Sequence, residues 1–189
     1  MSPLRPLIEH VRPEDYGIGM PGDRVVLAAY DDRWPQLYTA VEQYLLSLLP
    51  IVKMYHVGST SIPNMPAKPI LDIVATATNL HEVEDMRPAL ETLGGEWRGE
   101  FGIVGRRYVP FSSDGLSMIH LHLYGADHAD PDRMVQFRDW MRTHDDDAAA
   151  YAELKQACAT RFGFDRLAYT EAKGPFIASI FTKIEGQRG

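Results

Sequence analysis

The sequence predicts an α+β fold in which helices pack on a mixed β-sheet and the C-terminal third of the chain is helical. Short β-rich runs bounded by turn residues recur between residues 51 and 124, whereas only helical spacing of apolar residues follows residue 131. The 189 residues, 45% of them hydrophobic, suffice for one domain with a full core. We expect this domain over residues 24–186, after a loosely ordered arm at 1–23 that is rich in proline and glycine.

The first half of the chain alternates between strand and helix patterns. Trp34, Leu37 and Val41 begin a series of apolar residues at helical spacing, and Gly94-Gly95 is a typical end of a helix. The predicted elements of this half are a strand over 24–30, a helix over 34–48, strands over 51–57 and 69–77, and a helix over 80–93.

The second half is predicted to contain a β-hairpin followed by helices. Residues 97–111 indicate two irregularly paired strands, and the turn at 112–115 leads into a strand over 116–124 that pairs with residues 103–111. Three helices are expected after residue 131, with apolar faces marked by Phe137 and Trp140, by Tyr151 and Cys158, and by Ile177 and Ile180.

Composition excludes several functional classes. The net charge of −7 disfavours binding to DNA or RNA along a broad surface, which needs clustered positive charge. The single cysteine, Cys158, leaves no internal disulfide, and its place in an apolar helical pattern favours a buried structural thiol. No apolar run approaches the roughly 20 residues of a membrane span, and the N-terminus has no signal peptide pattern, so we expect a cytoplasmic protein without a membrane partner.

The turn between the strands at 51–57 and 69–77 is a candidate phosphate site. Gly58 permits close approach of a ligand, and exposed backbone N–H groups of Ser59, Thr60 and Ser61 can bind an anion. Lys68 adds a positive charge suited to phosphate. The alternative is a tight connection whose hydroxyl groups satisfy only their own backbone.

Asp72, His120 and His122 are candidate catalytic or metal-binding residues. Side chains alternate along a strand, so Asp72 projects from the face opposite the core, and His120 and His122 share one face of their strand. If the two strands are neighbours, the three side chains converge and can bind one divalent metal ion or act as acid and base. Alternatively, the histidines are polar residues of a half-exposed strand.

Other cations are candidates for completing an anion pocket. One residue of the pair Arg106-Arg107 must face the same side as Asp72, and Arg107 is the one we select. Arg138, Lys155 and Lys173 lie in the helical third and are further candidates. The default for each is a solvated charge or a modest ion pair.

The runs HVGSTSIPNMPAKPILDI, IHLHLY, FRDWMR and YAELK, with the spacing from Tyr169 to Lys173, resemble the GrpB-like proteins, a bacterial family, over residues 25–185. That family is similar to the DNA polymerase β-like nucleotidyltransferases, whose motif is a Gly-Ser pair followed by a strand bearing Asp-x-Asp or Asp-x-Glu. The resemblance implies a mixed sheet of the nucleotidyltransferase type, with Gly58 and Ser59 holding phosphate and Asp72 holding magnesium.

The second strand carboxylate of that motif is absent, because its position is occupied by Val74. Two-metal phosphoryl chemistry needs several anionic oxygens, and histidine is a poor magnesium ligand. Two functions therefore remain. One is a divergent nucleotidyltransferase-fold enzyme that acts on a nucleotide or another phosphate-bearing small molecule with one divalent ion. The other is a non-catalytic binding module with a nucleotide- or coenzyme-linked role, as the fusion of some family members to dephospho-CoA kinase suggests.

Overall fold

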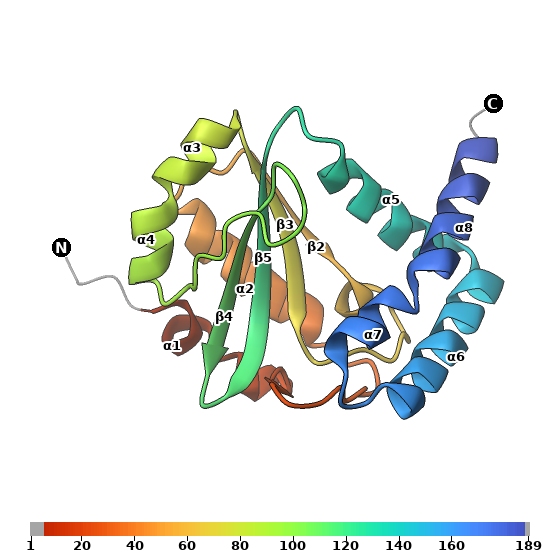
Figure 1. Ribbon diagram of the computed structural model, residues 1–189. Helices are drawn as coiled ribbons and strands as arrows, with labels where there is room; N and C mark the ends of the chain where they lie inside the picture. The colour runs from red at the N-terminus through yellow and green to blue at the C-terminus, as the bar shows by residue number, and fades with distance from the viewer. Residues whose placement is uncertain (1–5, 188–189) are drawn as a thin grey trace.

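The computed structural model describes residues 6–187, which fold into a mixed five-stranded sheet with helices on both faces (Figure 1). The strand order is β1-β5-β3-β2, and β4 pairs with the other edge of β5. The predicted α+β class and the helical C-terminal third are confirmed. The strands are β1 (Met20–Pro21), β2 (Lys53–Val57), β3 (Leu71–Ala77), β4 (Arg107–Ser113) and β5 (Leu116–Gly125).

The central pair, β3 and β5, runs parallel, and the register sets Asp72 beside His120 and Val74 beside His122. The other pairings are antiparallel. The predicted hairpin is confirmed, because β4 and β5 are joined through Asp114 and Gly115, whose φ angles of 51° and 75° are those of a tight turn.

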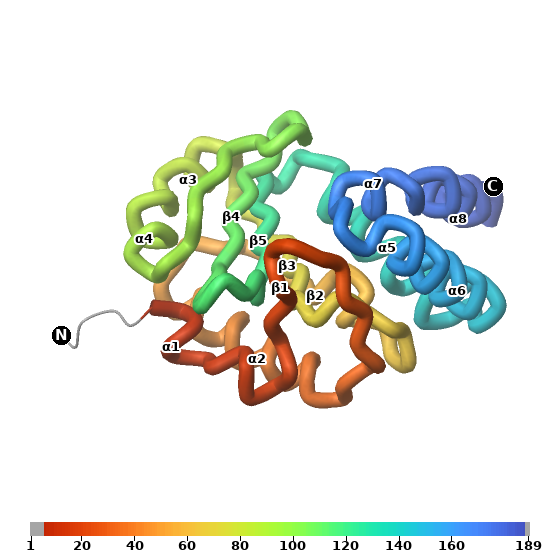
Figure 2. Tube along the Cα trace, turned by 60° about the horizontal axis from the view of Figure 1, so that its bottom comes forward, coloured from red at the N-terminus to blue at the C-terminus, as the bar shows by residue number. Residues whose placement is uncertain are grey.

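The helices form two groups that lie on opposite sides of the sheet, as Figures 1 and 2 show. The first group comprises α1 (Leu7–Val11), η1 (Pro13–Tyr16), α2 (Trp34–Leu46), α3 (Leu80–Asp85) and α4 (Arg87–Thr92). The second comprises α5 (Asp130–Thr143), α6 (Asp145–Arg161), α7 (Arg166–Glu171) and α8 (Gly174–Gly186). A short 3-10 turn, η2 (Ser59–Ser61), follows β2 and belongs to neither group.

The main core lies between the sheet and the first group of helices. Trp34, Leu37 and Val41 of α2 are at most 1% exposed and pack in one cluster with Leu71 and Ile73 of β3. The alternation predicted for β3 is therefore confirmed. The predicted helix over 80–93 is divided in two, because Pro88 in the first turn of α4 has no N–H to continue the helix from α3.

The opposite face of β3 is partly covered rather than open. Val74 is fully buried against α5, where Met134 and Val135 pack with Val57 and Tyr124. Beyond this contact, α5, α6 and α8 pack on one another through a second apolar cluster. The cover over the strands is therefore complete at one end and leaves room at the end that bears Asp72.

Three sequence-based expectations need correction. The segment 6–23 is not a loose arm, because Leu7, Ile18 and Met20 are at most 2% exposed in the core and β1 pairs with β5; residues 1–5 lie outside the described part of the chain. The expected strand at 24–30 is reduced to one bridge between Ala28 and Ala67. Residues 97–106 form an irregular loop, and a single strand follows at β4. Within residues 6–187, no helix is sufficiently long and apolar to cross a membrane.

Candidate functional site

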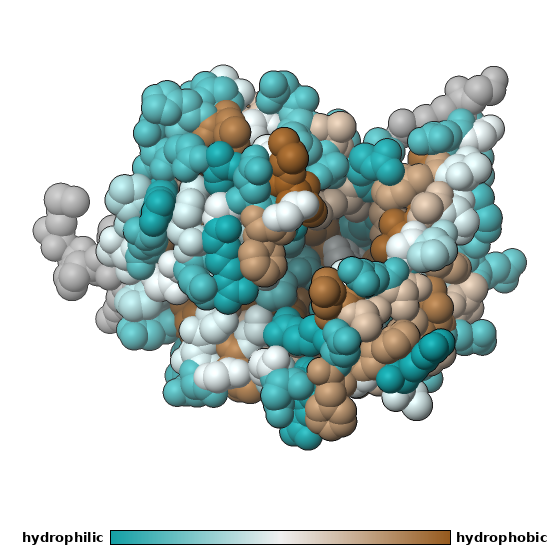
Figure 3. Space-filling view, viewed as in Figure 1, coloured by the Kyte–Doolittle hydropathy of each residue, from teal (hydrophilic) through white to brown (hydrophobic). Residues whose placement is uncertain are grey.

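A cavity of about 400 Å³ lies between the exposed end of the sheet face and the C-terminal helices. Gly58, Asp72 and His122 line it from the strand side, and Phe137 and Phe181 line it from α5 and α8. In the space-filling view, the surface is hollowed between the strands and these helices (Figure 3). The cavity therefore combines a polar floor with an aromatic wall.

Asp72 and the two histidines converge as the alternation predicted. His120 Nδ1 lies 3.2 Å from Asp72 Oδ1, and His122 Nε2 lies 3.9 Å from the same oxygen. Although burial opposes it, hydrogen bonding and charge from the two histidines hold the pKa of Asp72 below its ordinary range. Burial lowers the pKa of His120, although Asp72 opposes this effect. We therefore expect an ionised Asp72 beside a neutral His120 at neutral pH.

Ser117 extends this group, and sequence reasoning missed it. Its Oγ lies 2.9 Å from His120 Nε2. Strict alternation would place Ser117 on the face opposite His120, but the register of β4 with β5 shifts between Phe111 and Ser112. Met118 and Ile119 both turn into the core at this bulge, so Ser117 and His120 share the face of the sheet that bears Asp72.

Arg106, rather than Arg107, is the arginine that reaches the site. Arg106 Nη1 lies 3.5 Å from His122 Nδ1, and the same guanidinium donates hydrogen bonds to two backbone carbonyls of the preceding loop. Arg107 points to the other side of β4, where its Nε lies 2.5 Å from Glu84. The buried Val109 two residues on was a usable signal, since Arg107 shares its face.

The donors around Asp72 do not fit a metal centre. Both ring nitrogens of His120 already have partners, His122 Nδ1 faces the Arg106 guanidinium, and Val74 supplies no second carboxylate. Within the part of the chain that the structure describes, no group of three or more His, Cys, Asp or Glu side chains is arranged to hold a metal ion. The arrangement of these side chains therefore gives no support to the metal role expected for Asp72, His120 and His122.

The hydroxyl groups of the turn at Gly58 are partly engaged with the protein itself. Thr60 Oγ1 donates to the carbonyl of Ile70 at 3.2 Å and lies 3.0 Å from His56 Nε2, and Ser61 Oγ donates to the carbonyl of Gly58 at 2.6 Å. These two hydroxyls therefore bond groups of the protein itself, which is the alternative that the sequence left open for this turn. Ser59 differs, because its side chain bonds the buried phenol of Tyr151 at the cavity.

Two arginines of α5 fasten this turn to the helix. Arg138 Nη1 donates to the carbonyl of His56 at 2.9 Å, and Arg142 donates to the carbonyl of Ser61 at 2.6 and 3.0 Å. Arg138 also pairs with Asp139 at 2.7 Å. Its charge is thus used in positioning the turn, contrary to the expectation that it contacts a ligand.

Lys68, Lys155 and Lys173 form a cluster, although they come from a loop, from α6 and from the start of α8. The Nζ atoms of Lys68 and Lys173 lie 5.5 and 4.4 Å from the ring centre of Tyr169. Lys155 is 1% exposed, and its Nζ donates to the carbonyl of Pro66. Within residues 6–187, neither Lys68 nor Lys173 forms an ion pair.

Burial depresses the pKa of all three lysines. The pKa of Lys155 is lowered to about 7, first by burial and then by the charges of Lys173 and Lys68. That of Lys173 is lowered to about 8, by burial and by Lys68. Asp72 opposes the shift at each lysine. The site therefore sets three basic side chains against one ionised carboxylate in a chain that is acidic as a whole.

Tyr169 supplies an unused hydrogen-bonding group at this cluster. Its side chain is fully buried, and its hydroxyl finds no partner among the described residues. Buried hydroxyls nearly always have a partner, because an unpaired polar group costs about 1–3 kcal/mol. The two lysines lie over the ring of Tyr169, and its hydroxyl is available to a polar molecule.

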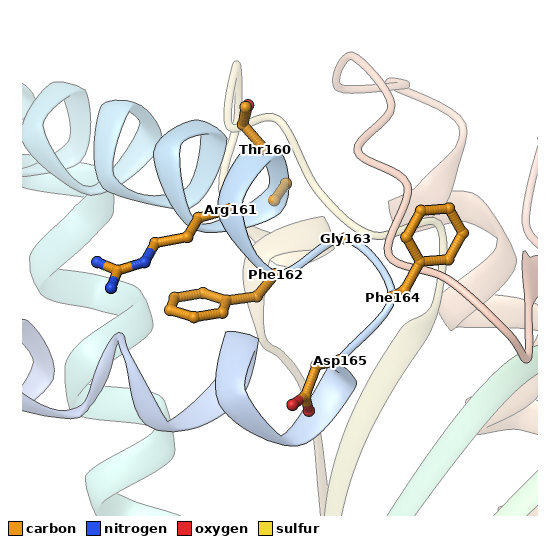
Figure 4. A pocket seen from close by; sticks show the side chains of 7 residues that line it. Thr160, Arg161, Phe162, Gly163, Phe164 and Asp165 are labelled. Carbon is orange, nitrogen blue, oxygen red and sulfur yellow. The ribbon is translucent and has the colours of Figure 1, made fainter.

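A second depression lies at the loop between α6 and α7. Among the described residues that line it, none has an unpaired buried polar atom like the Tyr169 hydroxyl. Figure 4 shows Arg161 and Phe162 on one side of the loop and Phe164 on the other. Arg161 stacks over the Phe162 ring at 5.0 Å, and the Asp165 carboxylate caps α7 by accepting from the N–H of Ala168. Its charged side chains thus serve the local structure, and the cleft at Asp72 is the stronger candidate.

Comparison with known proteins gives a consistent family. The chain is 37% identical over 165 residues to UPF0157 protein PA4798 of Pseudomonas aeruginosa, covering 84% of this chain and 66% of that protein. It is 33% identical to a UPF0157 protein of Streptomyces coelicolor, covering 86% of this chain and 85% of that one. The chain spans about two thirds of the Pseudomonas protein and 46% of the Bacillus subtilis UPF0157 protein YqkA.

A solved structure has the same fold. The crystal structure of conserved protein GrpB from Enterococcus faecalis matches with a TM-score of 0.77 at 30% identity, over 84% of this chain and 96% of that chain. Residues 24–183 match the sequence pattern of the family described as GrpB protein. The chain therefore belongs to the GrpB family.

Proposed function

We propose that this protein binds a phosphate-bearing small molecule in the cleft between the sheet and the C-terminal helices. The observation that carries the proposal is the cluster of Lys68, Lys155 and Lys173 near Asp72, whose carboxylate lines the cavity together with that of Asp130. Burial drives the three lysines toward their neutral forms, and an anion of charge −2 or more would stabilise the charged forms. The unpaired Tyr169 hydroxyl can donate to the same anion.

A nucleotide is the ligand class that the rest of the cavity supports. Phe137 and Phe181 line its wall with ring centres 6.2 Å apart, and the Arg133 guanidinium lies 4.1 Å from the centre of the Phe181 ring. Aromatic rings and arginine planes stack well on a base. Phosphates directed past Asp72 toward the lysines, which do not themselves line the cavity, and a base directed toward these rings would use both regions.

The side chains around Asp72 favour binding of the ligand without a two-metal centre. Val74 and the occupied nitrogens of His120 leave Asp72 as the one carboxylate of the nucleotidyltransferase pattern. The lysines would then neutralise phosphate charge in place of magnesium.

Thermal unfolding with inorganic pyrophosphate and ATP, each with EDTA or with Mg²⁺, tests the proposal. A ligand at about 100 times its Kd stabilises by about 2.7 kcal/mol, which raises the Tm of a chain of this size by several degrees. We expect that rise in EDTA. Lys68→Met and Lys173→Met should abolish it while leaving the free protein at least as stable, because each removes a buried charge.

Lys183→Met is the matched control, since Lys183 is half-exposed and pairs with Asp147 on α6. This variant should keep the full rise in Tm. The absence of a rise with either compound, or an equal rise in Lys68→Met, would refute binding at the lysine cluster. A rise that requires Mg²⁺ would contradict metal-free binding and support a metal-dependent enzyme instead.

A further inference from the structure

A continuous hydrogen-bond chain joins Ser117, His120 and Asp72. Ser117 Oγ is 2.9 Å from His120 Nε2, and His120 Nδ1 is 3.2 Å from Asp72 Oδ1. One assignment of protons satisfies both contacts: the neutral ring donates from Nδ1 to the carboxylate, and Nε2 accepts from the Ser117 hydroxyl. From this geometry we propose that Ser117 is a nucleophile, with His120 as its general base and Asp72 orienting the ring.

The bulge in β5 argues that this contact is built into the fold. Ser117 lies inside the sheet, paired with Met20 of β1 on one side and with Ser112 of β4 on the other. Without the extra residue, Ser117 would point into the core. Bulges near active sites commonly redirect a side chain in this way.

The neighbouring serine of the hairpin has no such partner. Ser113 Oγ is 3.1 Å from an Asp114 oxygen at the tip of the turn, and no imidazole contacts it. Ser59 and Ser61 are likewise bonded to Tyr151 and to a backbone carbonyl. Among the described serines, Ser117 therefore has the partner that can take its proton.

The surroundings of Ser117 suit transfer of a phosphoryl group. Besides burial, the charge of Lys68 contributes to lowering the pKa of His120, so one lysine of the basic cluster acts on the chain from Ser117 to Asp72. Ser117 Oγ would attack phosphorus as the bond from phosphorus to the leaving oxygen breaks. The Ser117 proton passes to His120 Nε2 and then to the leaving oxygen, and Asp72 stays ionised throughout. The choice of phosphorus rests on the proposed function, whereas the activation of Ser117 does not.

Labelling with a fluorophosphonate reporter tests the nucleophile directly. Attack by Ser117 forms an oxygen–phosphorus bond and expels fluoride, and His120 takes the serine proton. We expect mass spectrometry to find one adduct, on Ser117. Ser117→Ala should abolish it, and His120→Gln should slow it about 100-fold or more, the range of a general base. Ser113→Ala should label at the wild-type rate.

A second variant separates activation from folding. In Ser117→Cys, we expect alkylation by iodoacetamide to follow a pH profile set by His120, and this profile should be lost in the double variant with His120→Gln. Cys158 is buried and serves as the slow internal reference. Equal alkylation rates with and without His120, or a fluorophosphonate adduct spread over several serines, would overturn the proposal. Pyrophosphate binding does not depend on either result.

Discussion

Gly58 packs directly against the carboxylate of Asp72: a Cβ placed on Gly58 would lie 2.6 Å from Asp72 Oδ2 and 2.9 Å from its Cβ. The backbone of Gly58 has φ 68° and ψ −173°, a region that side-chain-bearing residues rarely occupy. The glycine thus lets the turn after β2 approach the carboxylate that holds His120.

Gly58→Ala should therefore destabilise the protein strongly. The backbone conformation costs about 1–3 kcal/mol for a residue with a Cβ, and the contact with Asp72 adds roughly 1–3 kcal/mol of overpacking. We expect chemical denaturation to show a loss of about 2–6 kcal/mol.

Gly99→Ala is the matched control, because Gly99 also has a positive φ, of 60°, but nothing lies within 4 Å of its added Cβ. It should lose only the backbone part, about 1–2 kcal/mol. Similar losses at the two positions would show that the contact between Gly58 and Asp72 carries no steric cost.

The buried lysines predict a stability that rises with pH above neutrality. The pKa of Lys155 is about 7 in the folded protein and about 10.5 in the unfolded chain, chiefly because of burial. Between these values the unfolded chain holds a proton that the folded chain has released. The free energy of unfolding should therefore increase by up to about 1.4 kcal/mol per pH unit for this group. Lys173, with a pKa of about 8, adds to the slope above pH 8.

Urea denaturation at pH 7, 8 and 9 measures this slope. Lys155→Met should reduce this slope. It should stabilise the protein most at pH 7, where about half of the folded molecules carry a protonated Lys155. Lys183→Met should keep the wild-type slope. An unchanged slope in Lys155→Met would mean that Lys155 remains protonated in the folded protein.

Local periodicity was sufficient to predict which faces Asp72, His120 and His122 occupy, and their convergence followed only if the two strands were neighbours. Two strands of regular alternation fixed the faces, and the parallel register of β3 with β5 brought them together. The same rule failed at Ser117, because a bulge inserts one residue and inverts the alternation. A bulge depends on the pairing of two strands, and a single strand pattern does not reveal it.

The sequence identified Lys68, Lys155 and Lys173 as separate candidates for anion binding. It did not predict that the three side chains lie close together. Lys155 held a signal, since it lies four residues after Tyr151 and three before Cys158, on the buried stripe of α6. Its approach to Lys68 and Lys173 depends on how α6 and α8 pack over the sheet. Helix packing angles arise from long-range contacts, so residue spacing alone could not give them.

The same limit explains residues 6–23. Prolines and glycines correctly indicate interrupted structure there, since α1 and η1 are short and β1 has two residues. Composition could not show that Leu7 and Met20 fill gaps in the core, because the partners of these side chains lie far away in the sequence. The prediction of a loose arm thus mistook an irregular backbone for a poorly ordered one.

The unpaired hydroxyl of Tyr169 separates the effect of a substitution on the free protein from its effect on binding. Tyr169→Phe removes a group that has no partner among the described residues, so it should leave the free energy of unfolding unchanged or raise it by about 1 kcal/mol. It should also reduce the rise in Tm with pyrophosphate, because a donor to the anion is lost. Differential scanning fluorimetry with and without pyrophosphate measures both effects.

Tyr38→Phe provides the contrast, because the Tyr38 hydroxyl lies 2.5 Å from Glu42 Oε1 and 2.9 Å from the carbonyl of Met54. Removing it should cost about 1 kcal/mol and leave the pyrophosphate effect intact. If Tyr169→Phe destabilises the free protein as Tyr38→Phe does, the Tyr169 hydroxyl has a partner in solution. If the pyrophosphate effect survives Tyr169→Phe in full, the anion lies away from this ring, and the lysines must hold it from their other side.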